Sequence, residues 1–177
     1  MAAAAGNIEA VDEVNRADEH GRTQLYIACQ NGRVAAARLL LEKGAEVDRA
    51  AEDGNTPLLI ACAAGQVDAV RLLLEKDAEL DRTNKDGTTP LITACWNGHV
   101  GAARLLLGNG AAVDRTMNDG RTPLYIVCES GHVDAVRLLL ENGAEVDRAD
   151  KWGNTPLSIA KNKGNSSIIA LLEEHQK

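Results

Sequence analysis

Side chains that could bind a metal ion or act as nucleophiles recur at a fixed interval in this sequence. Its four cysteines are 33 residues apart, at Cys29, Cys62, Cys95 and Cys128. A zinc site needs ligands clustered at short spacing, and a disulfide needs Cα atoms within about 7 Å. Packed helices lie about 8–10 Å apart. If the copies stack as helices, the cysteines are therefore small core residues, and we predict neither a metal ion nor a disulfide.

The histidines offer no catalytic pair either. His99 and His132 follow a glycine at the same place in two copies of the repeat, which favours a structural role, whereas His20 and His175 are isolated. No nucleophile and base can be assigned to each other. We therefore predict no catalytic residues, no cofactor and no metal.

Two columns of arginine follow the same interval. The members of one column are Arg38, Arg71, Arg104 and Arg137, and three of them have a glutamate four residues later, at Glu42, Glu75 and Glu141. The members of the other are Arg49, Arg82, Arg115 and Arg148, each directly after an aspartate. Oppositely charged residues four apart on a helix pair weakly in solvent. The columns therefore predict surface charge ladders and not a phosphate site.

A 33-residue repeat defines the elements that must position these side chains. Glycine recurs at Gly21, Gly54, Gly87, Gly120 and Gly153, each followed two residues later by threonine. Proline comes next in every copy except the first, where Gln24 stands. Threonine caps a helix N-terminus and proline suits the first helical position. A helix is therefore predicted to begin at each of these sites.

A second glycine column predicts where these first helices end. Its members are Gly32, Gly65, Gly98, Gly131 and Gly164, and glycine readily takes the left-handed conformation after a helix. An amphipathic second helix is predicted to start near Val34, Val67, Val100 or Val133. The polar stretch between each second helix and the next copy is predicted to be a hairpin-like connector.

The segment DGRTPLYIVCESGHVDAVRLLLENGAEVD, residues 119–147, resembles the ankyrin repeat. The resemblance extends over most of the chain. It implies an all-α fold, an ankyrin-repeat solenoid of helix-turn-helix units with projecting hairpin connectors and a concave binding face. The predicted divisions are a truncated N-terminal cap at 1–17, repeats at 18–50, 51–83, 84–116 and 117–149, and a C-terminal capping repeat at 150–177.

Two departures from the family pattern affect the expected contacts. The family usually has histidine after Thr-Pro-Leu, but this sequence has Tyr26, Leu59, Ile92, Tyr125 and Ser158. The hydrogen bonds of that histidine must be replaced or lost. Asp77 stands where other second helices end in glycine, and a left-handed backbone there would cost about 1 kcal/mol.

The two ends of the array differ. Ser166, Ser167, Glu173 and Glu174 make the last copy polar, as a cap requires. At the other end the leucine-rich turn is missing. Either the chain is a piece of a longer array, or Ala2 to Val11 forms a short helix. We expect a monomer, or weak self-association through the short cap.

Composition limits the class of partner. The 177 residues are 45% hydrophobic and 25% charged, which is typical of an ordered soluble protein, and the net charge is -7. That charge disfavours nucleic acid and favours a protein with a basic surface. No segment approaches the ~20 apolar residues of a membrane span, and no secretory signal is recognisable. A cytoplasmic or nuclear location is predicted.

Positions that vary between otherwise uniform copies predict the binding surface. They lie at the connector tips and the exposed ends of the first helices, and we select Arg22, Gln30, Asn31, Asn55, Ala63, Ala64, Trp96, Asn97, Arg121, Glu129, Trp152 and Asn154. Tryptophan is enriched at binding hot spots. We expect Trp96 to face solvent on the concave face beside Ala63 and Ala64, with Arg121 and Trp152 framing the same groove.

These observations favour a protein-protein interaction scaffold without enzymatic turnover. One alternative is an artificial, consensus-like ankyrin binder, which the uniformity of the copies favours, although Asp77 and the broken N-terminus favour a natural array. A ligand-binding or enzymatic domain is a remote alternative, because it needs a deep pocket that thin repeats do not offer.

Overall fold

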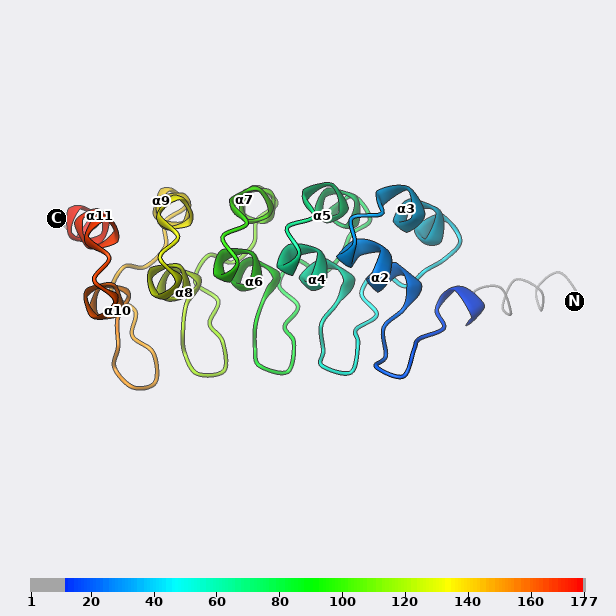
Figure 1. The fold of residues 1–177 in the computed structure, drawn as a ribbon, viewed down its shortest axis with the longest axis horizontal. Coiled ribbons are helices and arrows are strands. Elements are labelled where there is room, and N and C mark those ends of the chain that lie inside the picture. Colours follow the sequence, from blue (N-terminus) through cyan, green and yellow to red (C-terminus); the bar gives the residue numbers. More distant parts are fainter. Residues whose placement is uncertain (1–11, 177) are drawn as a thin grey trace, which may run out of the picture.

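The structure is a computed structural model that describes residues 12–176, in which two rows of helices stack along one axis (Figure 1). The predicted helix at Ala2 to Val11 lies outside these residues. The inner helices, next to the connectors, are α2 (Gln24–Gln30), α4 (Pro57–Ala63), α6 (Pro90–Trp96), α8 (Pro123–Ser130) and α10 (Pro156–Lys163). The outer helices are α3 (Val34–Glu42), α5 (Val67–Leu74), α7 (Val100–Gly108), α9 (Val133–Glu141) and α11 (Ser166–His175).

Five connectors project from the row of inner helices, and we number them hairpins 1 to 5 by the glycine at each tip (Figure 1). These glycines are Gly21, Gly54, Gly87, Gly120 and Gly153, and all have positive φ. Within residues 12–176 there is no β-strand, only an isolated antiparallel bridge between Ala17 and Thr23. The predicted all-α ankyrin-type stack is confirmed.

Each inner helix begins where the threonine column predicts. The threonine side chain accepts a hydrogen bond from the backbone N–H three residues later, as between Thr56 and Leu59 at 3.2 Å. At the last inner helix Ser158 also accepts from the backbone N–H of Thr155, which completes a capping box. These bonds satisfy N–H groups that have no partner inside the helix.

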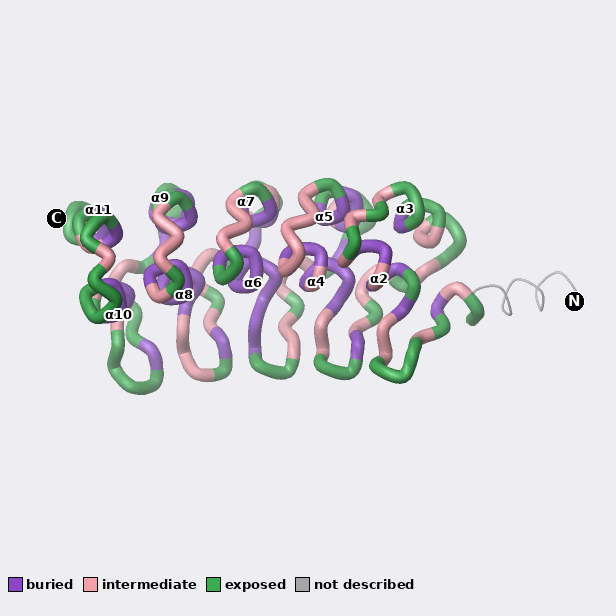
Figure 2. The backbone as a smooth tube through the Cα atoms, viewed as in Figure 1, coloured by how far each residue is buried: buried purple, intermediate pink, exposed green. Residues whose placement is uncertain are grey.

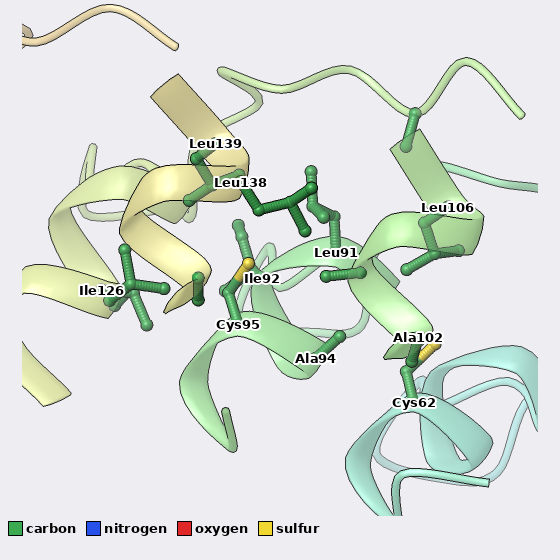
Figure 3. Close-up of a cluster of buried hydrophobic side chains, with 14 of the residues drawn as sticks. Cys62, Leu91, Ile92, Ala94, Cys95, Ala102, Leu106, Ile126, Leu138 and Leu139 are labelled. Atoms are coloured by element: carbon green, nitrogen blue, oxygen red, sulfur yellow. The ribbon is translucent and has the colours of Figure 1, made fainter. Parts of the chain in front are cut away.

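The hydrophobic core lies between the two rows of helices, where buried residues form a continuous band (Figure 2). Leucine, isoleucine, alanine and cysteine fill it, and Leu91, Leu106 and Leu139 are fully buried. Figure 3 shows Cys62 and Cys95 on neighbouring inner helices, each among apolar side chains. The core position predicted for the cysteine column is confirmed, since all four thiols are free and buried.

Burial should also make these thiols slow to react. It raises the pKa of Cys29, Cys95 and Cys128 to about 12 and raises that of Cys62 as well. Because the thiolate is the reactive form, a chromogenic disulfide reagent at neutral pH should modify all four only after denaturation. Fast modification of any cysteine in the native protein would contradict its assigned position in the core.

Asp77 adopts the left-handed conformation that its position in the repeat predicts. Its φ is 59°, and no other non-glycine residue among those described has a positive φ. It ends the turn after α5, where Gly44, Gly110 and Gly143 end the corresponding turns. The second copy therefore carries a backbone cost that the others avoid.

Neighbouring copies are joined at the hairpins and at the inner helices. One backbone hydrogen bond joins each pair of adjacent hairpins. The N–H donates to the carbonyl of the preceding hairpin in the pairs Glu52 to His20, Lys85 to Asp53, Asn118 to Asp86 and Lys151 to Asp119. At the inner helices, Nε2 of His99 lies 3.1 Å from the Ala63 carbonyl oxygen, and Nε2 of His132 lies 3.0 Å from that of Trp96. Side-chain amides of Gln66 and Asn165 make the equivalent bonds. The structural role predicted for the two histidines is confirmed.

A third set of bonds corrects the predicted charge ladders. The aspartates before the arginines, Asp48, Asp81 and Asp114, accept backbone N–H groups of the next copy, such as that of Glu79 at 3.1 Å. Arg49 and Arg82 pair instead with Glu46 and Glu79. Among the described residues no ion pair within 4.0 Å joins an outer-helix arginine to the glutamate four residues later, so that prediction was wrong. These arginines are exposed to solvent, where such pairs are weak.

Candidate functional site

Trp96 and Arg121 meet at the centre of the predicted surface. Trp96 is the last residue of α6, and 43% of it is exposed. The guanidinium carbon of Arg121, from hairpin 4, lies 5.5 Å from the centroid of the Trp96 ring. Its Nε is 2.8 Å from Asp119 Oδ2, and its Nη1 is 3.2 Å from Glu129 Oε2. Two carboxylates thus hold the cation against an aromatic ring, which favours a fixed orientation of both side chains.

The neighbouring inner helix ends in two alanines. Ala63 is the last residue of α4 and Ala64 is its C-cap, and both are half-buried. Because α4 packs directly against α6, these methyl groups lie in the copy next to Trp96. The aromatic ring is therefore not an isolated apolar group on this side of the stack.

The polar residues selected at the helix ends also serve their own helices. The side-chain amides of Asn31 and Asn97 donate to the carbonyls of Ile27 and Thr93, at 2.8 and 2.9 Å. The carbonyl of Gln30 accepts a bond from Gln66. These bonds leave the Asn31 and Asn97 side-chain oxygens available as acceptors.

The polar residues selected at the hairpin tips are held in the same way. Arg22 binds Asp18, with Nη2 2.8 Å from Oδ2, and this contact lowers the pKa of Asp18 to about 2. Asn55 donates to Asp53 at 2.6 Å, and Asn154 donates to Asp150 at 3.1 Å. These contacts fix the tips of hairpins 1, 2 and 5.

Trp152 stands at the tip of hairpin 5 and is 71% exposed. Its backbone N–H donates to Asp150 at 2.9 Å, so the main chain is fixed while the ring projects into solvent. In the described part of the chain no ring contact joins Trp152 to Trp96 or Arg121. The predicted place of Trp152 at the edge of the groove around Trp96 and Arg121 therefore stays a prediction.

One of the clefts in the described structure lies between hairpins 1 and 2, and Arg22 is the only selected residue that lines it. It has a volume of 310 Å³, and its lining residues are His20, Arg22, Tyr26, Ala51, Glu52 and Asp53, from hairpins 1 and 2 and the start of α2. Burial raises the pKa of the Tyr26 phenol, and the nearby Asp53 carboxylate raises it further. The sequence did contain a signal for this cleft. Only two copies have an arginine directly after the tip glycine and a tyrosine four residues after that arginine.

Residues 12–176 contain no group of three or more His, Cys, Asp or Glu side chains arranged to hold a metal ion. Over the same residues no helix is both long and apolar enough to cross a membrane. The candidates for binding include the exposed tryptophans, the Arg121 cluster and the cleft between hairpins 1 and 2.

Two family models match the chain. The family model described as ankyrin repeats in three copies matches residues 47–117 and 106–177, and the model described as a single ankyrin repeat matches residues 20–49. No curated protein matches the chain. The matched segments together extend over the whole of residues 20–177.

Proposed function

The chain belongs to the ankyrin repeat family, whose repeats generally bind other proteins, and we propose that it is a scaffold that binds a partner protein through its concave face. We define this face as the hairpins together with the exposed ends of the inner helices.

The exposure of Trp96 is the observation that carries this proposal. The same helical place holds Gln30, Ala63, Glu129 and Asn162 in the other copies, so packing does not require an aromatic residue there. The Trp96 ring is 43% exposed, so its contact with water is costly. The neighbouring Arg121 lies over the ring and already orders it. Both properties favour binding, because a preordered side chain loses little entropy on association.

The net charge of -7 supports a partner with a basic surface, because opposite charge accelerates encounter. The rim of the proposed site contains the carboxylates of Asp119 and Glu129, which are only partly neutralised by the single Arg121. We infer an extended or loop-like protein segment as the bound element, because a row of hairpins offers a long and shallow surface.

Replacement of Trp96 by alanine tests the proposal. Peptides selected from a random display library against the full chain would be measured against wild type and Trp96→Ala. We expect the variant to lose about 2 kcal/mol of binding free energy, a factor of about 30. Its free energy of unfolding should fall by less than ~1 kcal/mol, since the residue is exposed and loses mainly the contact with Arg121.

Leu39→Ala is the control for that experiment. Leu39 is also a large exposed hydrophobic residue, at 52%, but it lies on the outer helix α3, away from the hairpins. Its replacement should leave peptide affinity unchanged. Peptides that bind Trp96→Ala as tightly as wild type would show that the concave face around Trp96 is not the binding surface.

A further inference from the structure

The first and fourth copies allow the same six positions to be compared within one molecule. Both copies contain arginine and tyrosine at matching places, Arg22 with Tyr26 and Arg121 with Tyr125. The six lining positions of the cleft between hairpins 1 and 2 correspond, 99 residues later, to Asp119, Arg121, Tyr125, Asp150, Lys151 and Trp152. Differences between the two sets show which polar and charged groups the cleft has in place of those at hairpins 4 and 5.

The tyrosine hydroxyls differ in their surroundings. Burial raises the pKa of the Tyr125 phenol, and the nearby Asp150 carboxylate raises it further. Ala51 stands at the matching place beside Tyr26, so that carboxylate is absent, and the Tyr26 hydroxyl makes no hydrogen bond to any described residue. Tyr26 is 4% exposed and lines the cleft. No fully buried side-chain polar atom lacks a partner among residues 12–176, so this hydroxyl must reach the cleft.

The rim is more acidic at hairpin 2 than at the matching place in hairpin 5. Lys151 and Trp152 of hairpin 5 correspond to Glu52 and Asp53 of hairpin 2. Both carboxylates are exposed, and Asp53 accepts only from the backbone and side chain of Asn55 among the described residues. A carboxylate has about four acceptor positions, so Asp53 retains capacity for another donor.

The two basic groups of the cleft do not cancel these carboxylates. Arg22 donates through Nε and Nη2 to Asp18, at 2.9 and 2.8 Å, and is therefore neutralised by its own hairpin. His20 lies 3.8 Å from Glu19 and carries charge only when protonated. At neutral pH the side of the cleft formed by hairpin 2 is therefore net acidic.

We propose, as an extension that rests on the function proposed above, that this cleft binds an arginine side chain of the partner protein, between the Tyr26 hydroxyl and the carboxylates of Glu52 and Asp53. A guanidinium presents five N–H donors in a planar fork, enough for all three acceptors. Hairpins 1 and 2 are fixed to each other by the bond from the Glu52 N–H to the His20 carbonyl, so the backbones that carry the acceptors keep their relative position.

The chain itself contains an arginine held by two carboxylates. Arg121 lies over an aromatic ring, Trp96, and donates to Asp119 and Glu129. The cleft also offers two carboxylates, with the Tyr26 hydroxyl in place of the ring face, while its own Arg22 is directed at Asp18. An arginine from a partner would supply the missing component.

A small probe tests the cleft without knowledge of the partner. Uniformly ¹⁵N-labelled full chain would be titrated with N-acetyl-arginine amide and, separately, with N-acetyl-citrulline amide, in which a neutral urea replaces the guanidinium. We expect saturable shifts of the Tyr26, Glu52, Asp53 and Gly54 amides, with about fivefold weaker binding of the citrulline probe. The matching amides of hairpin 5 serve as an internal control and should not respond.

Grafting the residues of hairpin 5 gives the matched variant. Glu52→Lys with Asp53→Trp introduces side chains that the same fold accepts 99 residues later, and it should reduce binding of the arginine probe by about fivefold or more. Asp53→Asn is the conservative second variant, usable if the graft disturbs folding, and should weaken binding in the same direction. Equal affinity for both probes, equal shifts at hairpins 2 and 5, or unchanged binding by Asp53→Asn would overturn the proposal.

The result of the arginine titration can be distinguished from the result of the peptide-binding test of the proposed function. The probe does not need Trp96, so Trp96→Ala should bind N-acetyl-arginine amide as wild type does. Loss of peptide binding in Trp96→Ala with no arginine response would support the scaffold function and reject the arginine cleft. A specific arginine response with unchanged peptide affinity in Trp96→Ala would support the cleft and reject the Trp96 surface.

Discussion

Replacement of Leu106 by alanine is expected to lower the free energy of unfolding by about 2–5 kcal/mol. Leu106 is 0% exposed and lies on α7, near Leu91 of α6 (Figure 3). Shortening its isobutyl side chain to a methyl group in a tightly packed layer loses transfer free energy and leaves a cavity that helices on both sides prevent from collapsing. Urea denaturation of the full chain, followed by circular dichroism, measures this loss.

Leu39→Ala provides the comparison, because Leu39 belongs to the leucine-rich segment of another outer helix, α3, but is 52% exposed. Its replacement should cost less than ~1 kcal/mol. Similar losses for Leu106→Ala and Leu39→Ala would mean that burial does not distinguish the two sites, and the position assigned to the core between the helix rows would then be wrong.

Gly54→Ala is expected to lower the free energy of unfolding by about 2–4 kcal/mol, from two causes. Gly54 has a φ of 86°, where a side chain is strained. In addition, an alanine Cβ would lie 2.9 Å from the backbone nitrogen of Lys85 and 3.0 Å from Asn84 Cα, both in hairpin 3. Since the obstacle is backbone, relief requires the hairpins to separate. Thermal and urea unfolding of the variant measure the effect.

Gly153→Ala separates the two causes. Gly153 has nearly the same φ, 83°, but an alanine Cβ there would meet no atom of the described residues within 4 Å, because hairpin 5 is the last of the row. Its replacement should cost only the backbone strain, about 1–2 kcal/mol. An equal loss in the two variants would refute the close approach of hairpins 2 and 3.

The secondary structure was predictable because its signals are local. A threonine such as Thr56 caps a helix with atoms three residues away, and Asp77 takes a left-handed backbone because its place in the turn requires one. The alternation of inner and outer helices follows from the same 33-residue pattern. The repeat boundaries that we proposed, by contrast, stay a prediction.

The contacts between copies were less predictable because the choice of partner depends on how the copies stack. Asp48 stands beside Arg49 in the sequence, yet it accepts the backbone N–H of Glu79 in the next copy. This bond satisfies a backbone donor that would otherwise lack a partner, whereas an exposed pair with Arg49 would contribute little.

The candidate site was predictable in its positions and not in its contacts. Variation between copies identified Trp96 and Arg121 separately, and the structure brings them together across two copies. Variation between copies identified Arg22 but not the cleft that it lines beside Tyr26. It becomes visible only when a buried residue, Tyr26, is considered together with the tips of two hairpins.

The bonds between copies have a mechanical consequence. Three sets of bonds cross the junction between α4 and α6, and likewise that between α6 and α8, so a pulling force along the stack is shared by all three. The junction between α2 and α4 has all three sets as well. Under tension the helices α2 and α6, which carry Tyr26 and Trp96, should therefore keep their spacing.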